Sequence, residues 1–488
     1  MGEAEEGGVI FLRGLYLLNK MRRITNIDDL REIFKNFKKP LIGIGISAFS
    51  RLGPEKFISN YHIVCLANGR DLELIKRDVK VLSAEELNEK NLKIRRNSSS
   101  LLGLEIIKKF LNSFDNPYLL FYKVTKKIKK LCNEEKWNII GNEIYERIDN
   151  KALLRKILDK CGLPAIPGEI CSLPRKCYKE LRNKYGNKIV IQAFKGSGGK
   201  GTFFVDSQKD FKRAKEKILE KGCSEVVVTK FIEGPSPSLT GCVTKHGILY
   251  TNLQYQLLDI HEVMNPEVGN GVFCGHDWTS SNDFPEEIQK QAYLYARKIG
   301  QYLKTMGYKG IFGLDMIIDK KNDKIYVTEI NPRLLGSFPV ITMVQELNNE
   351  PLLIGFHILE FLEEGYDLDI EKVNKLMKKL KTGAHLILFN KYKGLARNRK
   401  SLKSGVYMMK DKKLKYLRRG YNLRDLKERG EFILVDSVPF ENTVYKPHER
   451  ILRIVTFEKL IDKKNYKLNT WAKRVVKKIY QNLDLVPA

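Results

Sequence analysis

The stretch from Gly313 to Pro339, GLDMIIDKKNDKIYVTEINPRLLGSFP, restricts the fold of this chain more than any other part of it. An apolar run at Leu314–Ile318 is followed by a polar segment, Lys320–Asp323, that ends in the turn-forming pair Asn-Asp. Lys324–Ile330 then resumes the apolar pattern. Two strand-forming runs on either side of a short turn predict a β-hairpin.

Three oxygen-bearing side chains fall on this hairpin. Glu329 and Asn331 are two positions apart, so they share one face of a strand, and pairing can bring Asp315 opposite them. Carboxylate and amide oxygens suit a hard cation such as Mg²⁺, or Mn²⁺ in its place. Arg333 follows two residues later, and its guanidinium can clamp an anion beside the metal. We therefore predict a metal site at these three residues, with Arg333 as the catalytic anion-binding group.

Solvated charges are the alternative interpretation of Asp315 and Glu329, because polar residues on one face of a hairpin are common. Glu329, however, lies between Val327 and Ile330 in a mostly apolar strand. An unpaired carboxylate is costly in such a position, which favours a neutralising partner.

A glycine-rich loop lies between two further strands, predicted at Lys188–Phe194 and Phe203–Asp206. Four glycines let backbone N–H groups converge on phosphate without obstruction by Cβ atoms, and the loop lysines add positive charge. A flexible hairpin loop would have the same composition. The predicted phosphate-binding residues are Lys195, Gly196, Ser197, Gly198, Gly199, Lys200, Gly201 and Thr202.

The composition is that of an ordinary globular protein, with 43% hydrophobic and 30% charged residues in a chain of 488, long enough for two or three domains. The net charge of +29 raises the question of nucleic-acid binding. Lysine and arginine are nevertheless spread along the chain, without a zinc finger or an aromatic-rich RNA-binding signature. We expect a basic surface that attracts anionic substrates, and not nucleic-acid binding as the main role.

Eight cysteines are scattered without a C-x-x-C pair, which argues against a zinc site and favours reduced thiols. The apolar stretch Val9–Leu18 contains Arg13 and is too short to span a bilayer. We expect a cytoplasmic protein that does not bind a membrane.

Three regions are predicted along the chain. Alternating strands and helices in residues 1–145 indicate an open parallel β/α domain. Residues 146–375 begin with an amphipathic helix at Asn150–Cys161 and contain the glycine loop and the hairpin. Residues 376–488 form a β-rich domain that ends in a basic amphipathic helix, Asn469–Leu485, expected to dock against the body. The fold class is therefore α/β, or α+β with the last region included.

The first predicted strand contains Gly43-x-Gly45-x-x-Ala48, which superficially matches a dinucleotide-binding fingerprint. The glycines fall inside the strand, however, and no acidic residue stands about 20 positions further on. Packing is the expected role of these glycines.

The order of these features resembles the ATP-grasp superfamily, which includes biotin carboxylase and the carboxylate–amine ligases. The resemblance covers about Lys151–Leu362. It rests on the entry stretch NKALLRKILDKCGLPAIPG, the glycine loop, the segment VVVTKFIEG at 226–234, and the pattern D…E-x-N-x-R. It implies a two-subdomain fold with ATP bound between the subdomains.

The resemblance also assigns nucleotide contacts. Lys151 would contact phosphate, and Gln192 stands where the family usually has a lysine that reaches the α-phosphate. Main-chain groups of Lys230 and Ile232 would read the adenine edge, and Glu233 is the candidate for the ribose. Thr229 replaces a glutamate usual in the family, so adenine recognition departs from the common pattern.

The chemistry implied is that of a ligase that uses ATP and Mg²⁺. A small-molecule carboxylate held by Arg333 would attack the γ-phosphate and form an acylphosphate, which an amine or thiol acceptor would displace, giving ADP and phosphate. The resemblance is also compatible with a homodimer.

Three alternatives remain open at this point. The first is a bicarbonate-dependent enzyme of the biotin carboxylase or carbamoyl-phosphate type. The second is a non-catalytic ATP-binding protein, which the departures at Gln192, Thr229, Ser236 and Ser238 keep in consideration. The third is RNA binding through the basic surface, which would show a steep salt dependence.

Overall fold

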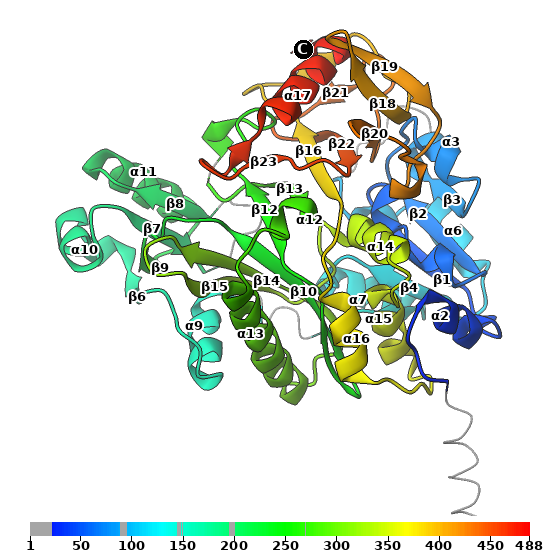
Figure 1. Ribbon diagram of the computed structural model, residues 1–488, viewed down its shortest axis with the longest axis horizontal. Coiled ribbons are helices and arrows are strands. Elements are labelled where there is room, and N and C mark those ends of the chain that lie inside the picture. Colours follow the sequence, from blue (N-terminus) through cyan, green and yellow to red (C-terminus); the bar gives the residue numbers. More distant parts are fainter. Residues whose placement is uncertain (1–21, 88–94, 144–147, 149, 195–200, 269) are drawn as a thin grey trace, which may run out of the picture.

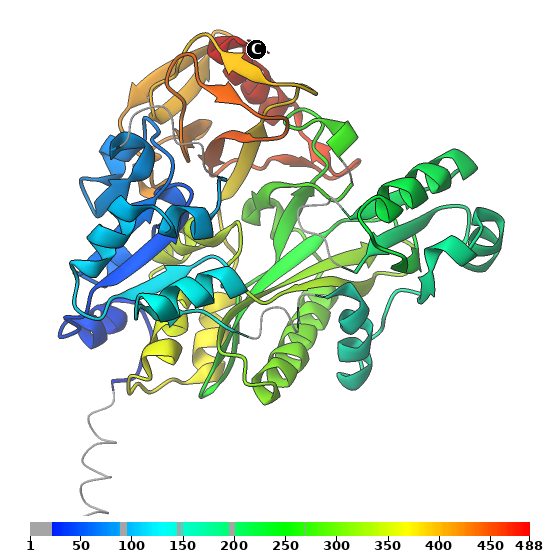
Figure 2. The same ribbon diagram turned by 180° about the vertical axis from the view of Figure 1, so that it is seen from behind.

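The computed structural model describes residues 22–87, 95–143, 148, 150–194, 201–268 and 270–488 (Figure 1). A small sheet carrying α10 and α11 projects from one side of the molecule, and the N-terminal sheet lies on the other side (Figures 1 and 2). Within the described ranges, no helix is both long enough and apolar enough to cross a membrane.

The N-terminal region is an open parallel sheet in the order β3-β2-β1-β4-β5, as predicted. Its central strand is buried at all five positions, because helices cover both faces. The strands are β1 Leu41–Gly45, β2 Tyr61–Cys65, β3 Lys80–Ser83, β4 Tyr118–Phe121 and β5 Asn138–Ile140. The helices are α2 Ile27–Phe34, α3 Leu72–Ile75, α4 Ala84–Leu87, α5 Ser98–Leu102, α6 Glu105–Asn112 and α7 Lys126–Glu134.

The two glycines of β1 have a packing role, as expected. A Cβ atom at Gly43 would lie 2.1 Å from the hydroxyl oxygen of Tyr61, and one at Gly45 would lie 3.0 Å from Cγ of Arg51. Any larger side chain would displace these neighbours, so glycine is required by close approach.

The projecting sheet is antiparallel, in the order β6-β9-β7-β8. One of its faces packs on α10 and α11 in a small apolar core of its own. Helix α9 connects it to the N-terminal region. These elements are α9 Lys151–Lys160, β6 Gly168–Ser172, α10 Tyr178–Tyr185, β7 Ile189–Ala193, β8 Thr202–Val205, α11 Gln208–Leu219 and β9 Glu225–Lys230.

A long antiparallel sheet forms the centre of the molecule, in the order β15-β14-β10-β12-β13-β16-β22-β20-β18-β19, with β11 paired to β10. The first part of this sheet contains β10 Pro237–Thr244, β11 Gly247–Tyr250, β12 Gln254–Leu258, β13 Phe273–Asp277, β14 Gly310–Asp319 and β15 Lys324–Asn331. Its helices are α12 Trp278–Ser281, α13 Glu286–Thr305, α14 Phe338–Leu347, α15 Leu353–Leu362 and α16 Ile370–Met377. Helix α13 buries Ile288, Ala292, Ile299 and Leu303, one stripe of its surface, in the core with β10 and β14.

Part of the C-terminal region continues this same sheet, because β13 pairs with β16. The sheet therefore runs across the domain boundary predicted at residue 376. Its C-terminal strands are β16 Ala384–Phe389, β18 Gly405–Lys410, β19 Lys413–Arg418, β20 Glu431–Val435 and β22 Arg450–Thr456. A separate small sheet contains β17 Ala396–Asn398, β21 Val444–Tyr445 and β25 Leu485–Pro487, and another pairs β23 Ile461–Asp462 with β24 Lys467–Leu468. The terminal helix α17, Thr470–Leu483, buries Val475, Ile479 and Leu483 in the adjoining core, so the predicted docking is confirmed.

Candidate active site

The hairpin β14–β15 brings the predicted metal ligands together. Asp315 pairs with Glu329 across the hairpin, and Gly313 pairs with Asn331. The side-chain amide of Asn331 donates a hydrogen bond of 2.9 Å to Oδ2 of Asp315. The register shifts directly after Asp315, which is the irregularity expected of a β-bulge that re-aims side chains at a site. Asp315, Glu329 and Asn331 thus form one cluster, as the sequence predicts.

The cluster carries an excess of negative charge. Burial, followed by repulsion from Glu329, raises the pKa of Asp315 to about 6, although Arg333 and Asn331 act in the opposite direction. A bound cation would remove this repulsion. Among the described residues, no group of three or more His, Cys, Asp or Glu side chains could hold a metal ion. Two carboxylates with an amide oxygen nevertheless fit Mg²⁺, which takes one or two carboxylates and completes its shell with water and phosphate.

A cleft of about 470 Å³ separates the projecting sheet from the central sheet, and Asp315 and Glu329 of the predicted metal site line it, whereas Asn331 does not. Most of the predicted nucleotide contacts line this cleft, although they come from segments far apart in sequence. They are Lys151, Gln192, Thr202, Lys230, Ile232 and Glu233, together with Asp315 and Glu329. Residues Lys195–Lys200 of the predicted glycine loop lie outside the described residues. Gly201 is at the loop end, where its carbonyl accepts a hydrogen bond of 2.9 Å from the Ala193 amide.

Two of the residues predicted to contact phosphate are fixed by local structure. Gln192 on β7 pairs with Thr202 on β8, and its amide donates to the Thr202 hydroxyl at 3.3 Å. Lys151 is the first residue of α9, and the Asn150 side chain caps that helix. Because its side chain is a neutral amide, Gln192 can offer a hydrogen bond to a ligand but no charge.

The segment after β9 forms the hinge between the two sheets. The amide of Lys230 donates to the Pro167 carbonyl at 2.9 Å, and Ile232 is buried. Glu233 forms an ion pair with Lys320, which lies in the turn of the metal hairpin. The hydrogen bond from Lys320 lowers the pKa of Glu233. Glu233 therefore links the hinge to the hairpin in addition to lining the cleft.

Several residues of the cleft wall were not predicted, and four of them come from distant parts of the chain. Tyr255 and Gln256 come from β12, while Asn465 and Tyr466 come from the turn between β23 and β24, near the C-terminus. The rings of Tyr255 and Tyr466 are stacked with centroids 6.3 Å apart. These positions follow from long-range pairing of strands, so the local sequence holds no signal for them.

Arg333 lies two residues after the end of β15 and does not line the cleft. One of its guanidinium nitrogens donates to the Tyr122 hydroxyl at 2.5 Å, and another donates to Oδ1 of Asn331. The Tyr122 ring lies between two cations, 4.9 Å from Cζ of Arg333 and 6.0 Å from Cζ of Arg51. Arg333 thus connects the metal cluster to the N-terminal sheet.

A second cavity of about 560 Å³ lies beyond Tyr122. Ile46 and Ser47, which follow β1, line it together with Tyr122, which follows β4. Because β1 lies between β2 and β4, the strand order reverses at this point of the sheet. Ligands of open α/β sheets bind in the crevice at the carboxyl ends of strands where the order reverses. Other walls come from residues 96–99 and 123–128 of the N-terminal region, from residues 335–339, and from the C-terminal strands.

Buried charged groups form the floor of this second cavity. Arg453 on β22 makes an ion pair with Asp436, with nitrogen–oxygen distances of 2.9 Å. Asp436 also accepts a hydrogen bond of 2.5 Å from the Ser47 hydroxyl. The guanidinium of Arg453 lowers the pKa of Asp436 against the effect of burial. Arg450 lines the same cavity and is exposed, so the cavity favours an anionic ligand.

Residues 148–337 match the family model for the ATP-grasp domain. The chain is 26% identical over 235 residues to butirosin acyl-carrier protein–L-glutamate ligase of Niallia circulans, a match that covers 47% of this chain and 53% of that protein. It is 22% identical over 233 residues to the 2-oxoglutarate carboxylase small subunit of Hydrogenobacter thermophilus, covering 44% of this chain and 45% of that protein. The chain spans about half the length of these curated relatives.

Solved structures show the same fold. The biotin carboxylase domain of 2-oxoglutarate carboxylase from Hydrogenobacter thermophilus, solved with MgADP and bicarbonate, has a TM-score of 0.56 at 14% identity, covering 86% of each chain. Biotin carboxylase from Campylobacter jejuni has a TM-score of 0.56 at 16% identity, covering 86% of this chain and 87% of that chain. At these identities the likeness concerns the fold.

Proposed function

The chain belongs to the ATP-grasp superfamily through residues 148–337, and from this premise we propose that it is an ATP- and Mg²⁺-dependent ligase that activates a carboxylate as an acylphosphate. The observation that carries this proposal is the pairing of Asp315 with Glu329 in the wall of a cleft of nucleotide size. Burial and repulsion keep the pKa of Asp315 at about 6, so this pair is poised to accept a cation.

The cleft residues would hold MgATP as follows. Asp315, Glu329 and Asn331 would hold Mg²⁺, which would supply positive charge to offset the charge of the phosphates. Lys151 and Gln192 line the same cleft and would contact phosphate oxygens. The buried strand β9 and the hinge after it would exclude water from one side of the base. The chain itself therefore contributes positioning and electrostatic stabilisation.

The second cavity would bind the acid. Arg333 stands between the two sites, because its guanidinium contacts Asn331 on one side and Tyr122 on the other. A carboxylate held there would approach the nucleotide from the N-terminal side. The hydroxyl of Tyr122 and the neighbouring Arg51 fix the direction of the Arg333 guanidinium.

The proposed reaction needs no protein nucleophile. An oxygen of the carboxylate forms a bond to the γ-phosphorus while the bond between that phosphorus and the β,γ-bridging oxygen breaks, and the electron pair leaves with ADP. The lone pair of an amine, or a thiolate, then attacks the acyl carbon. Phosphate departs and the amine loses a proton, giving an amide or thioester. The relative from Niallia circulans bears the name of an acyl-carrier protein–L-glutamate ligase, which supports an amino acid among the substrates.

A screen of ATP turnover tests this proposal. The purified chain is incubated with MgATP and pools of amino acids, other small carboxylic acids and candidate amines, and released ADP and AMP are separated by chromatography. We expect ADP release that depends on one pool and is lost in Glu329→Gln. AMP as the product would indicate adenylation and would contradict the acylphosphate route.

Bicarbonate is the second candidate acid. The 22% identity to a 2-oxoglutarate carboxylase subunit favours it. Bicarbonate-stimulated ADP release in the absence of any organic acid would identify this alternative.

A further inference from the structure

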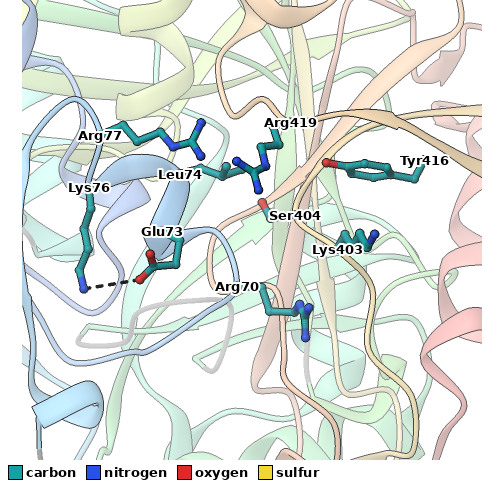
Figure 3. A pocket seen from close by; sticks show the side chains of 9 residues that line it. All are labelled: Arg70, Glu73, Leu74, Lys76, Arg77, Lys403, Ser404, Tyr416 and Arg419. Carbon is teal, nitrogen blue, oxygen red and sulfur yellow. Dashed lines mark ion pairs between the residues drawn. The ribbon is translucent and has the colours of Figure 1, made fainter.

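A basic groove, which among the described residues shares no lining residue with the second cavity, lies between segments of the N-terminal and C-terminal regions (Figure 3). Its volume is about 690 Å³. One wall is the segment around α3, and the other comes from the strands β18 and β19 with the residues that flank them. It is lined by Arg70, Glu73, Leu74, Lys76, Arg77, Lys403, Ser404, Tyr416 and Arg419. None of these residues lines the nucleotide cleft.

Positive charge in the groove exceeds negative charge. Its single carboxylate, Glu73, lies 3.7 Å from the ammonium of Lys76, the pair joined by the dashed line in Figure 3. Lys76 also pairs with Glu86. The other four cations are Arg70, Arg77, Lys403 and Arg419. Within the described part of the chain, none of these four has a carboxylate at ion-pair distance.

Arg418, which precedes Arg419, has the carboxylate partner that the four groove cations lack among the described residues. Arg418 makes a two-nitrogen contact with Glu431 on β20, and this hydrogen bond raises its pKa. Arg419, one position later, is exposed and turns to the groove. In Figure 3, Arg77 and Arg419 reach into the groove from its two walls, and the Tyr416 hydroxyl is directed toward them. Gathering these cations without a counter-ion costs repulsion energy, which a bound anion would relieve.

The size and chemistry of the groove select its ligand. Guanidinium forks match phosphate oxygens, and a phenolic hydroxyl adds a donor. A volume of about 690 Å³ is within the range of small-molecule pockets, about 300–1,000 Å³, and exceeds what one phosphate fills. A second copy of the chain is disfavoured, because residues 384–488 contain 26 Lys and Arg against 10 Asp and Glu.

We propose that this groove is a second ligand site, for a small molecule that carries two or more phosphate groups. The proposal is independent of the function assigned to the nucleotide cleft.

The groove also has a direct structural link to the second cavity. Arg70 precedes Asp71, whose buried carboxylate accepts hydrogen bonds from the backbone amides of Asp436, Ser437 and Val438. Asp436 and Ser437 line the second cavity and have φ values of +67° and +71°, a conformation that non-glycine residues rarely adopt. A ligand that fixes Arg70 would thus act one residue from the group that holds this loop.

Inorganic tripolyphosphate is a suitable probe. The full chain is titrated with it by calorimetry at 150 mM NaCl without Mg²⁺, as the wild type, as R77A/R419A and as the control K412A/K477A. The control removes the same two charges from exposed positions of the basic C-terminal region outside the groove. The nucleotide cleft also attracts phosphate, so tripolyphosphate can bind at more than one site. The measured quantity is therefore the binding that is present in the wild type and absent in R77A/R419A.

We expect R77A/R419A to lose one tripolyphosphate site, or to weaken it at least tenfold, while K412A/K477A stays within twofold of the wild type. Equal weakening in both variants, or no weakening in either, would overturn the proposal. Tighter binding of a single-stranded oligonucleotide than of tripolyphosphate would also overturn it, because the groove would then be part of a nucleic-acid surface. Unchanged binding of MgADP to R77A/R419A shows that the fold and the cleft are intact.

Discussion

Asp315 and Glu329 occupy directly opposed positions on the two strands of one hairpin, and the register shifts immediately after Asp315. Their proximity, added to burial, raises the pKa of Asp315 to about 6. The folded chain therefore holds two carboxylates together at a cost in stability that a bound cation would offset. This relationship connects the sequence pattern, the stability of the protein and the proposed chemistry.

Replacing Asp315 with asparagine should stabilise the ligand-free protein while strongly lowering the turnover of ATP. The amide removes the repulsion from Glu329 and still accepts a hydrogen bond from Asn331. We expect a gain of about 1–2 kcal/mol in the free energy of unfolding at pH 7.5, because one pKa unit corresponds to about 1.4 kcal/mol. Turnover of ATP should fall on the order of 100-fold, as when one electrostatic group of an active site is removed. Urea denaturation and ADP release measure the two effects.

Asp319→Asn is the matched control for this experiment. Asp319 lies on the same strand, is buried, and accepts a hydrogen bond from the Lys321 amide. It is absent from the cleft lining, so its substitution should leave turnover unchanged. A stability loss in Asp315→Asn, or equal loss of turnover in both variants, would contradict the charge assignment.

The pH dependence of metal-supported nucleotide binding should follow Asp315. Its pKa is raised from 3.8 to about 6 in the folded chain, so the protonated form is favoured by folding. The corresponding stabilisation is full below pH 4 and is lost as pH rises through 6. Metal binding requires the ionised form, so the affinity for MgADP should fall as pH drops from 7 to 5. Calorimetry at fixed ionic strength measures the affinity for MgADP at each pH. The same pH profile in Asp315→Asn would contradict the assignment of this pH dependence to Asp315.

Tyr122→Phe should separate binding of the acid from binding of the nucleotide. The substitution keeps the ring that packs between Arg333 and Arg51 and removes only the hydroxyl that accepts from Arg333. Hydrogen bonds to charged groups contribute about 1.5–3 kcal/mol, so KM for the acid should rise about tenfold or more. The Kd for MgADP should not change. Tyr118→Phe, in the same sheet, is the control, and a parallel rise of both constants would argue against a positioning role.

Arg453→Ala should destabilise the fold. It would leave the buried carboxylate of Asp436 without its guanidinium partner. Breaking a buried ion pair in this way typically costs about 3–5 kcal/mol. Arg450→Ala, on the same strand, removes an exposed arginine and should cost far less. A loss below about 1 kcal/mol for Arg453→Ala in urea denaturation would mean that this pair does not hold the cavity floor together.

The hairpin could be predicted from sequence because its information is local. Alternation along Lys324–Ile330 and a turn signal at Asn322 and Asp323 fix the pairing of two adjacent strands. The sequence order of the phosphate loop, hinge and hairpin then indicated the family. The placement of Lys151, Gln192 and Lys230 in one cleft agrees with the contacts that the family resemblance implied.

Long-range pairing was beyond sequence reasoning. The β13–β16 pairing joins segments more than 100 residues apart and makes five of the C-terminal strands part of the central sheet. A second long-range contact stacks the ring of Tyr466 on that of Tyr255 in the cleft. The structure also buries His276, whose Nε2 lies 2.9 Å from the hydroxyl oxygen of Ser238. Such contacts depend on which strands become neighbours, and no single segment specifies this.

Transfer of ¹⁸O tests the acylphosphate route most directly. The acid identified by the pool screen is labelled with ¹⁸O in its carboxylate and turned over with MgATP and the acceptor, and the released phosphate and nucleotide are analysed by mass spectrometry. Attack by the carboxylate on the γ-phosphorus predicts one ¹⁸O atom in each phosphate released and none in ADP. Unlabelled phosphate, or ¹⁸O recovered in AMP, would contradict the proposed activation of the carboxylate by phosphoryl transfer.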